Sequence, residues 1–133
     1  MDKKLIYWQA KARIGKADEV LPELLKVMAR NHPNSEIYTT ACIVFHALGE
    51  FELATGYFNS AGKLDDRNAK LLVAGSLLHT DLHNNEQGLE YLNKAAEISP
   101  NIVNTPLYQQ CKLRCLKAAN NLPMIQDYMM LSW

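Results

Sequence analysis

A period of about 34 residues runs along this 133-residue chain, and it restricts the fold more than any other feature of the sequence. Shifting the sequence by one period brings together apolar, small or turn-forming residues at four sets of positions. These sets are Gly15, Gly49 and His83; Val20, Ala54 and Gly88; Leu24, Phe58 and Leu92; and Val27, Ala61 and Ala95. A repeat of this length forms a small unit that cannot bury its apolar face alone, so we expect neighbouring units to stack.

Within one period the residues predict two short amphipathic helices joined by a tight turn. Phe51, Ala54, Phe58 and Ala61 recur at a spacing that places their side chains on one helical face. Leu and Ala together number 33, against 12 Val and Ile, and this composition favours helix over strand. No Asn-Gly or Asp-Gly pair is present to form a hairpin turn, so we expect an all-α chain without a sheet.

The turns and helix ends can be placed from Gly, Pro, Asn and Asp residues. Gly15 and Gly49 stand where a first helix should stop, a place that often needs a left-handed backbone. Asn84 or Asn85 is expected to serve this turn in the third unit, or to cap the helix that follows. Breaks between units are predicted at 32–34, 65–68 and 99–101, where one helix ends and side chains can cap the next.

This pattern resembles the tetratricopeptide repeat family, whose unit has the same length. The resemblance is strongest over 35–102, and the residues that carry it there are Tyr38, Cys42, Gly49, Phe51, Ala54, Phe58, Ala61, Leu72, Ser76, Gly88, Leu92, Ala95 and Pro100. Asp66 stands where the family usually has Pro, Trp8 occupies a position for a small residue, and the last unit departs from the pattern at 122–124.

The resemblance implies an all-α fold, a tetratricopeptide-like right-handed superhelix of about four antiparallel helix pairs. The whole chain, 1–133, is then a single helical-repeat domain. Its units are expected near 1–34, 35–68, 69–102 and 103–133, the last being a degenerate capping unit.

The resemblance also implies where a partner binds. In this family the first helices of successive units line a concave groove, and the matching positions here are Gln9, Arg13, Thr39, Ile43, His46, Lys70, Val73, Leu77 and Asp81. Ile43, Val73 and Leu77 form an apolar centre with charges at its margins, which suits an extended or helical peptide with apolar anchors. The alternative is that these residues are solvated or covered by the C-terminal segment.

The function implied is a non-enzymatic protein-protein interaction module of the adaptor, scaffold or dedicated-chaperone type, which binds a peptide or helix of a partner. Relatives that grip the C-terminal carboxylate of heat-shock chaperones use Lys, Asn and Arg side chains in this groove. The corresponding positions here hold Leu5, Gln9, Thr40, Lys70 and Ala74. Only Lys70 matches, so no carboxylate clamp of that kind is expected.

The C-terminal stretch 124–133 is rich in Met and other apolar side chains. It is expected to form a capping helix, an interface, or both, with Tyr128, Met129 and Trp133 as its contact residues. Met adapts to irregular surfaces and Trp anchors interfaces. The alternative function is therefore a structural subunit that assembles a homo-oligomer or a larger complex through its apolar terminal units.

Side chains with reactive chemistry are few. His79 and His83 are four residues apart, but two imidazoles supply only half of a tetrahedral metal site. Cys111 and Cys115 are also four apart and occupy packing positions, where a free cysteine acts as a small apolar residue. No phosphate-binding loop, serine-nucleophile motif or zinc-protease motif is present. We therefore expect no enzymatic activity, no metal and no cofactor.

The charges balance, with 14 basic and 14 acidic residues. This balance argues against a nucleic-acid binder, and no stretch is apolar enough for membrane insertion. Residues 1–16 carry a net +4, 17–102 a net −6 and 103–133 a net +2. An acidic middle between basic ends favours end-to-middle contacts or a partner with basic residues. Three cysteines are too few for a disulfide framework, so a cytoplasmic location is expected.

Overall fold

The computed structural model describes residues 3–32 and 34–117, and the regular structure in this part of the chain is helical. The helices are α1 (Lys3–Arg13), α2 (Ala17–Arg30), α3 (Ser35–Ala47), α4 (Phe51–Leu64), α5 (Ala69–Asp81), α6 (Asn85–Ile98) and the 3-10 helix η1 (Pro100–Asn104). A further helix covers 106–117. The prediction of an all-α chain without a sheet is confirmed for these residues. No helix within them has the length and apolar character needed to cross a bilayer.

The helix bounds repeat with the same period as the sequence. The second helices α2, α4 and α6 begin at Ala17, Phe51 and Asn85, and each has 14 residues. The first helices α3 and α5 begin at Ser35 and Ala69, and each has 13 residues. Three pairs of short helices therefore follow one another at intervals of one repeat period, as the spacing of small and apolar residues predicts.

The turn inside each unit has a left-handed residue at the same repeat position. Gly15 and Gly49 have φ values of 88° and 81°, which confirms the prediction for the first two units. In the third unit the residue with positive φ is His83, at 65°, so the turn role assigned to Asn84 or Asn85 was wrong. Asn84 instead occupies the N-cap position of α6, the alternative given for it, without a side-chain hydrogen bond. The turn keeps its register because the backbone bonds repeat: Glu50 N donates to Phe45 O, and Asn84 N donates to His79 O.

Asparagine side chains begin the first helices of the second and third units. Asn34 Oδ1 accepts hydrogen bonds from the backbone N–H groups of Glu36 and Ile37, at 2.8 and 3.2 Å. Asn68 Oδ1 accepts from Leu71 N at 3.1 Å. These bonds satisfy donors that the first turn of a helix leaves without partners. The predicted breaks at 32–34 and 65–68 are thus confirmed as helix boundaries.

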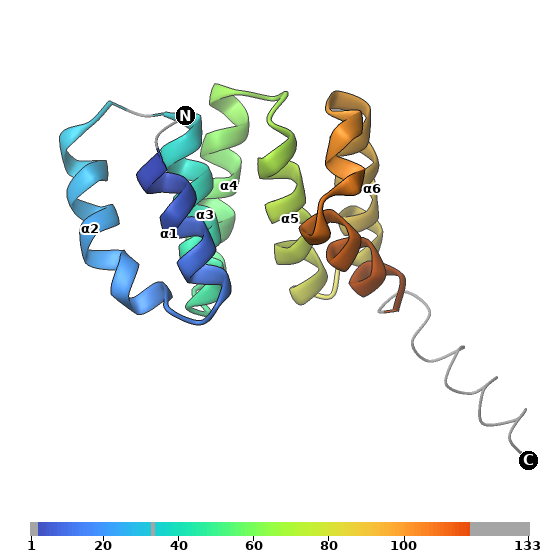
Figure 1. Cartoon of the computed structure of the whole chain (residues 1–133), viewed down its shortest axis with the longest axis horizontal. Coiled ribbons are helices and arrows are strands. Elements are labelled where there is room, and N and C mark those ends of the chain that lie inside the picture. The colour runs from blue at the N-terminus through green and yellow to red at the C-terminus, as the bar shows by residue number, and fades with distance from the viewer. Residues whose placement is uncertain (1–2, 33, 118–133) are drawn as a thin grey trace, which may run out of the picture.

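Each unit packs on the first helix of the next unit through both of its own helices. α1 contacts α3, α3 contacts α5, and α2 and α4 each lie against the first helix of the next unit. Figure 1 shows this succession from α2 to α6, with the helix 106–117 next to α5 and α6. One apolar core extends from α1 to α5 and a second lies among α5, α6 and 106–117. The protein thus distributes its buried surface along the stack of units.

Two glycines allow close approach between neighbouring helices. A Cβ atom on Gly75 of α5 would lie 2.1 Å from Cε2 of Phe58 on α4. A Cβ atom on Gly88 of α6 would lie 2.7 Å from Oγ1 of Thr80 and 3.1 Å from Sγ of Cys115. The distances of 2.1 and 2.7 Å are too short for a stable contact, and 3.1 Å is tight, so these positions accept only glycine without rearrangement of the neighbouring side chains.

The three cysteines are free and buried. Cys111 and Cys115 belong to the second apolar core together with Tyr108, which confirms that they occupy packing positions. Burial raises the pKa of the Cys42 and Cys111 thiols to about 12. Both thiols are therefore neutral at physiological pH.

Candidate partner-binding groove

A groove of about 540 Å³ opens between α1, α3, α5 and the helix 106–117. Its apolar lining is made by side chains of Ile43 on α3, Ala74 and Leu77 on α5, and Leu107 on 106–117. The charged and ionisable side chains that line it are Arg13, His46, Asp81 and Arg114. Pockets of this size and composition are typical of ligand sites, in which a few polar groups orient an apolar ligand.

A second, smaller pocket of about 290 Å³ lies beside the groove. It is lined by Arg13, Lys70, Val73, Ile102, Thr105 and Leu107. Arg13 and Leu107 line both pockets, so the two cavities share a boundary. The smaller pocket extends the apolar surface from α5 to the 3-10 helix η1.

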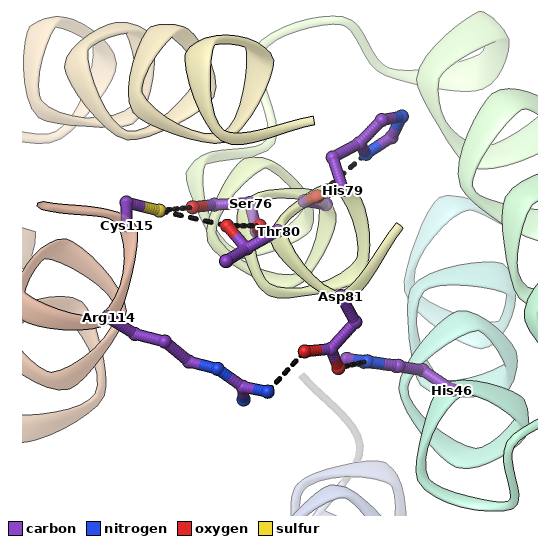
Figure 2. A network of polar contacts seen from close by, with 8 residues as sticks. His46, Ser76, His79, Thr80, Asp81, Arg114 and Cys115 are labelled. Carbon is purple, nitrogen blue, oxygen red and sulfur yellow. Dashed lines mark hydrogen bonds and ion pairs between the residues drawn. The ribbon is translucent and has the colours of Figure 1, made fainter. Parts of the chain in front are cut away.

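Asp81 connects three helices at the side of the groove. Its Oδ2 atom lies 2.5 Å from Nε2 of His46, and its Oδ1 atom accepts from Nη2 of Arg114 (Figure 2). The exposed fractions of the side chains are 19% for Asp81, 15% for His46 and 54% for Arg114. A carboxylate shared by two partners in a partly buried position holds α3, α5 and 106–117 in a defined relation.

A separate contact joins 106–117 to α5. Figure 2 shows the Cys115 thiol facing the hydroxyl groups of Ser76 and Thr80, with Sγ–Oγ distances of 3.3 and 3.0 Å. The Thr80 hydroxyl also donates to Ser76 O at 2.8 Å. Helix 106–117 is therefore attached to α5 by an ion pair beside the groove and by a buried polar contact. These two contacts hold its groove-lining residues in position.

Arg13 differs from Arg114 in its surroundings. Arg114 pairs with Asp81, whereas Arg13 makes no ion pair with any residue in the described part of the chain. Partial burial of the Arg13 guanidinium lowers its pKa. Arginine nevertheless stays charged at neutral pH, so Arg13 presents an unpaired cation at the boundary of the two pockets.

Most of the predicted groove residues meet in these two cavities. Arg13, Ile43, His46, Leu77 and Asp81 line the groove. Lys70 and Val73 line the smaller pocket. The predicted interface residues Tyr128, Met129 and Trp133 lie outside the described residues.

Two predicted groove residues require correction. Gln9 is only 2% exposed, and its Nε2 donates to Thr40 Oγ1 at 2.8 Å, between α1 and α3. Thr39 is fully buried, donates to Ser35 O and accepts from Asn68 Nδ2. Both side chains are used in packing between neighbouring units, because the next unit covers this edge of the first helix. Neither lines the groove or the smaller pocket.

The groove also includes residues that the sequence interpretation missed. Leu107, Gln110, Cys111 and Arg114 come from 106–117. The 34-residue period could have identified them. One more step of this period leads from Val73 to Leu107, from Leu77 to Cys111 and from Thr80 to Arg114. The weak match of the last unit to the family pattern hid this continuation.

The two spaced histidines have separate roles in the structure. His79 Nδ1 lies 2.8 Å from Gly75 O, and its ring packs against the rings of Phe58 and Tyr91. His83 is the left-handed residue of the third turn. Within the described residues, no group of three or more His, Cys, Asp or Glu side chains is placed to hold a metal ion. Comparison with known proteins adds no relative: no protein-family model matches the chain, and neither does any curated protein.

Proposed function

We propose that the protein is a tetratricopeptide-like right-handed superhelix that binds a peptide or helix of a protein partner in its groove. The observation that supports this most is the groove itself, in which Ile43, Leu77 and Leu107 from three different helices lie beside charged side chains. An apolar surface with charged margins is suited to peptide recognition. The recurrence of helix bounds at the repeat period supports the superhelical arrangement.

The proposed activity is non-enzymatic. Binding alone accounts for the arrangement of the groove, because its ionisable groups are engaged with one another or stand at its margin. Asp81 is shared by His46 and Arg114, and the Cys111 thiol is neutral as a result of burial. Such a module acts as an adaptor or as a chaperone for a dedicated partner.

A groove-blocking variant tests this proposal. Ala47 is exposed and lines the groove, so Ala47→Trp fills the groove without changing the core. Ala10 is also exposed and lines neither cavity, so Ala10→Trp is the matched control. A displayed library of random short peptides is selected against the unmodified protein, and the affinities of enriched peptides are measured by fluorescence anisotropy.

We expect enriched peptides to bind the unmodified protein and Ala10→Trp equally, and Ala47→Trp at least about tenfold more weakly, because a blocked pocket loses its apolar contacts. Circular dichroism establishes that each variant is folded. Peptides that bind all three proteins with equal affinity would show that the groove is not the binding site.

The second candidate function is a structural subunit. Ile6 and Tyr7 on α1 are 47% and 57% exposed, and adjacent exposed apolar side chains at a terminal unit favour association. Sedimentation equilibrium separates the two functions. A chain that stays monomeric at high concentration is not a self-assembling subunit, whereas a concentration-dependent increase in mass supports that role.

A further inference from the structure

Cations gather around the groove although the protein has no net charge. Of the residues that the structure describes, Arg13, Lys70 and Arg114 line the two cavities, and Asp81 is the single acidic residue among the lining side chains. These cations come from α1, α5 and the helix 106–117, so their proximity is a product of the stacking. Asp81 is already shared between His46 and Arg114, and Arg13 makes no ion pair within residues 3–32 and 34–117.

Arg13 also lines the smaller pocket. Among the residues that the structure describes, the others that line it are Lys70, Val73, Ile102, Thr105 and Leu107, and none of them is acidic. Arg13 stands at the boundary with the larger groove, where the wall is again apolar. A ligand that fills both cavities therefore places one apolar group on each side of Arg13.

We infer that the partner segment carries a carboxylate side chain between two aliphatic side chains. One aliphatic side chain enters the larger groove beside Ile43 and Leu77, and the other enters the smaller pocket beside Val73 and Ile102. The carboxylate between them accepts hydrogen bonds from Arg13, whose planar guanidinium matches a carboxylate with two parallel N–H groups. This inference rests on the proposed function, since it specifies the peptide that occupies the same groove.

The chemistry of the cavities argues for this ligand against others. The acidic middle of the sequence favours a basic partner, but Arg13 would repel basic side chains at the place where binding occurs. A nucleic acid needs an extended row of cations, and the aliphatic walls offer no ring on which a base could stack. An apolar peptide without a carboxylate would bury Arg13 against nothing of opposite charge, which is unfavourable.

The test uses peptides enriched on the unmodified protein in the library selection. Each peptide is synthesised in its selected form, with its acidic residue changed to the uncharged amide, and with that residue changed to Lys. Affinities are measured for the unmodified protein, for the double variant Arg13→Glu, Lys70→Glu, and for a control in which Lys63→Glu and Lys94→Glu reverse two exposed charges outside both cavities.

We expect the amide peptide to bind the unmodified protein about tenfold more weakly, since a hydrogen bond to a charged group is lost. The Arg13→Glu, Lys70→Glu variant should prefer the Lys peptide, while the control variant keeps the preference for the acidic one. If the double variant does not fold, the three peptides on the unmodified protein still decide the matter.

The outcomes separate the two proposals. Peptides that lose affinity for Ala47→Trp but carry no acidic residue, or bind equally well as amides, overturn the inference and leave the proposed function intact. If no enriched peptide depends on the groove, the proposed function fails and the inference fails with it. Acidic groove-dependent peptides that bind the Arg13→Glu, Lys70→Glu variant as well as the unmodified protein also overturn the inference.

Discussion

The second and third helix pairs have the same backbone plan but different chemistry. α3 and α5 have 13 residues each, α4 and α6 have 14, and the third pair begins one repeat period after the second. The turn of the second pair uses Gly49, whereas that of the third uses His83 in the same left-handed conformation. The helix–turn–helix backbone of a unit is therefore kept when histidine replaces the glycine of the turn.

Packing inside the two pairs also differs. In the second pair the rings of Phe45 and Tyr57 stack with centroids 5.4 Å apart, and Tyr38 packs against Tyr57 at 5.6 Å. In the third pair one ring contact, between His79 and Tyr91, is accompanied by the hydroxyl of Thr80 beside Gly88. The difference teaches that stacking requires complementary volumes at each junction, and that large rings and small polar groups can both supply them.

The substitution expected to change stability most lies where the second and third helix pairs meet. Gly75→Ala places a methyl group 2.1 Å from the Phe58 ring, and relief requires movement of a ring that also contacts Tyr91. We expect the free energy of unfolding to fall by about 2 kcal/mol, as measured by urea denaturation, because overpacking a dense core forces strain.

Gly56→Ala on α4 is the matched control, because a Cβ there meets no atom within 4 Å. This variant should be more stable by about 0.5–1 kcal/mol, since alanine favours the helix interior. Equal stability of Gly75→Ala and Gly56→Ala would mean that the Phe58 junction is not tightly packed.

A smaller loss is expected on the other side of the third pair. Gly88→Ala brings a methyl group 2.7 Å from Thr80 Oγ1 and 3.1 Å from Cys115 Sγ. We expect a decrease of about 1–2 kcal/mol in the free energy of unfolding, because these side chains are buried and cannot move aside freely.

The double variant Gly88→Ala, Thr80→Ser provides the check for this junction. Serine keeps the hydroxyl but removes the methyl group, so the side chain can turn away from the new Cβ. A double-mutant cycle in urea should then show coupling of about 0.5 kcal/mol or more. Strict additivity would place the cause of the destabilisation elsewhere.

The smallest effect concerns the turns. His83→Gly removes a side chain from a left-handed position with φ of 65°. We expect the free energy of unfolding, measured by urea denaturation, to rise by about 0.5–1 kcal/mol. Gly49→Ala, at a position where φ is 81°, should lower the free energy of unfolding by a similar amount. If His83→Gly is destabilised instead, the histidine side chain makes a favourable contribution that outweighs the backbone strain.

Much of the fold can be predicted from local residues. The spacing of Gly15 and Gly49 places two turns, and Asn34 and Asn68 mark two helix starts, because these residues act on the backbone next to them. The repeat period also aligns His83 with Gly15 and Gly49, but the left-handed conformation was assigned to Asn84 or Asn85 because histidine is a weaker local signal for it than glycine or asparagine.

The groove was predictable in outline but not in its detail. Helical periodicity places Gln9 and Ile43 on comparable faces of α1 and α3, yet Gln9 is covered by contact with Thr40 while Ile43 lines the groove. The angle at which one unit lies on the next decides which edge of a first helix is covered. That angle follows from packing among several helices and is not encoded at any one position.

The amino-acid sequence alone established the helical class, the length of the unit and the approximate ends of the helices, since each depends on residues close together in the chain. The tertiary structure alone decided which charged side chains meet. Arg13, Lys70 and Arg114 are distant in sequence, and they come to the groove and the adjoining smaller pocket because the units stack. The same stacking brings Asp81 to Arg114. Neutrality of the whole chain is therefore compatible with a locally cationic groove.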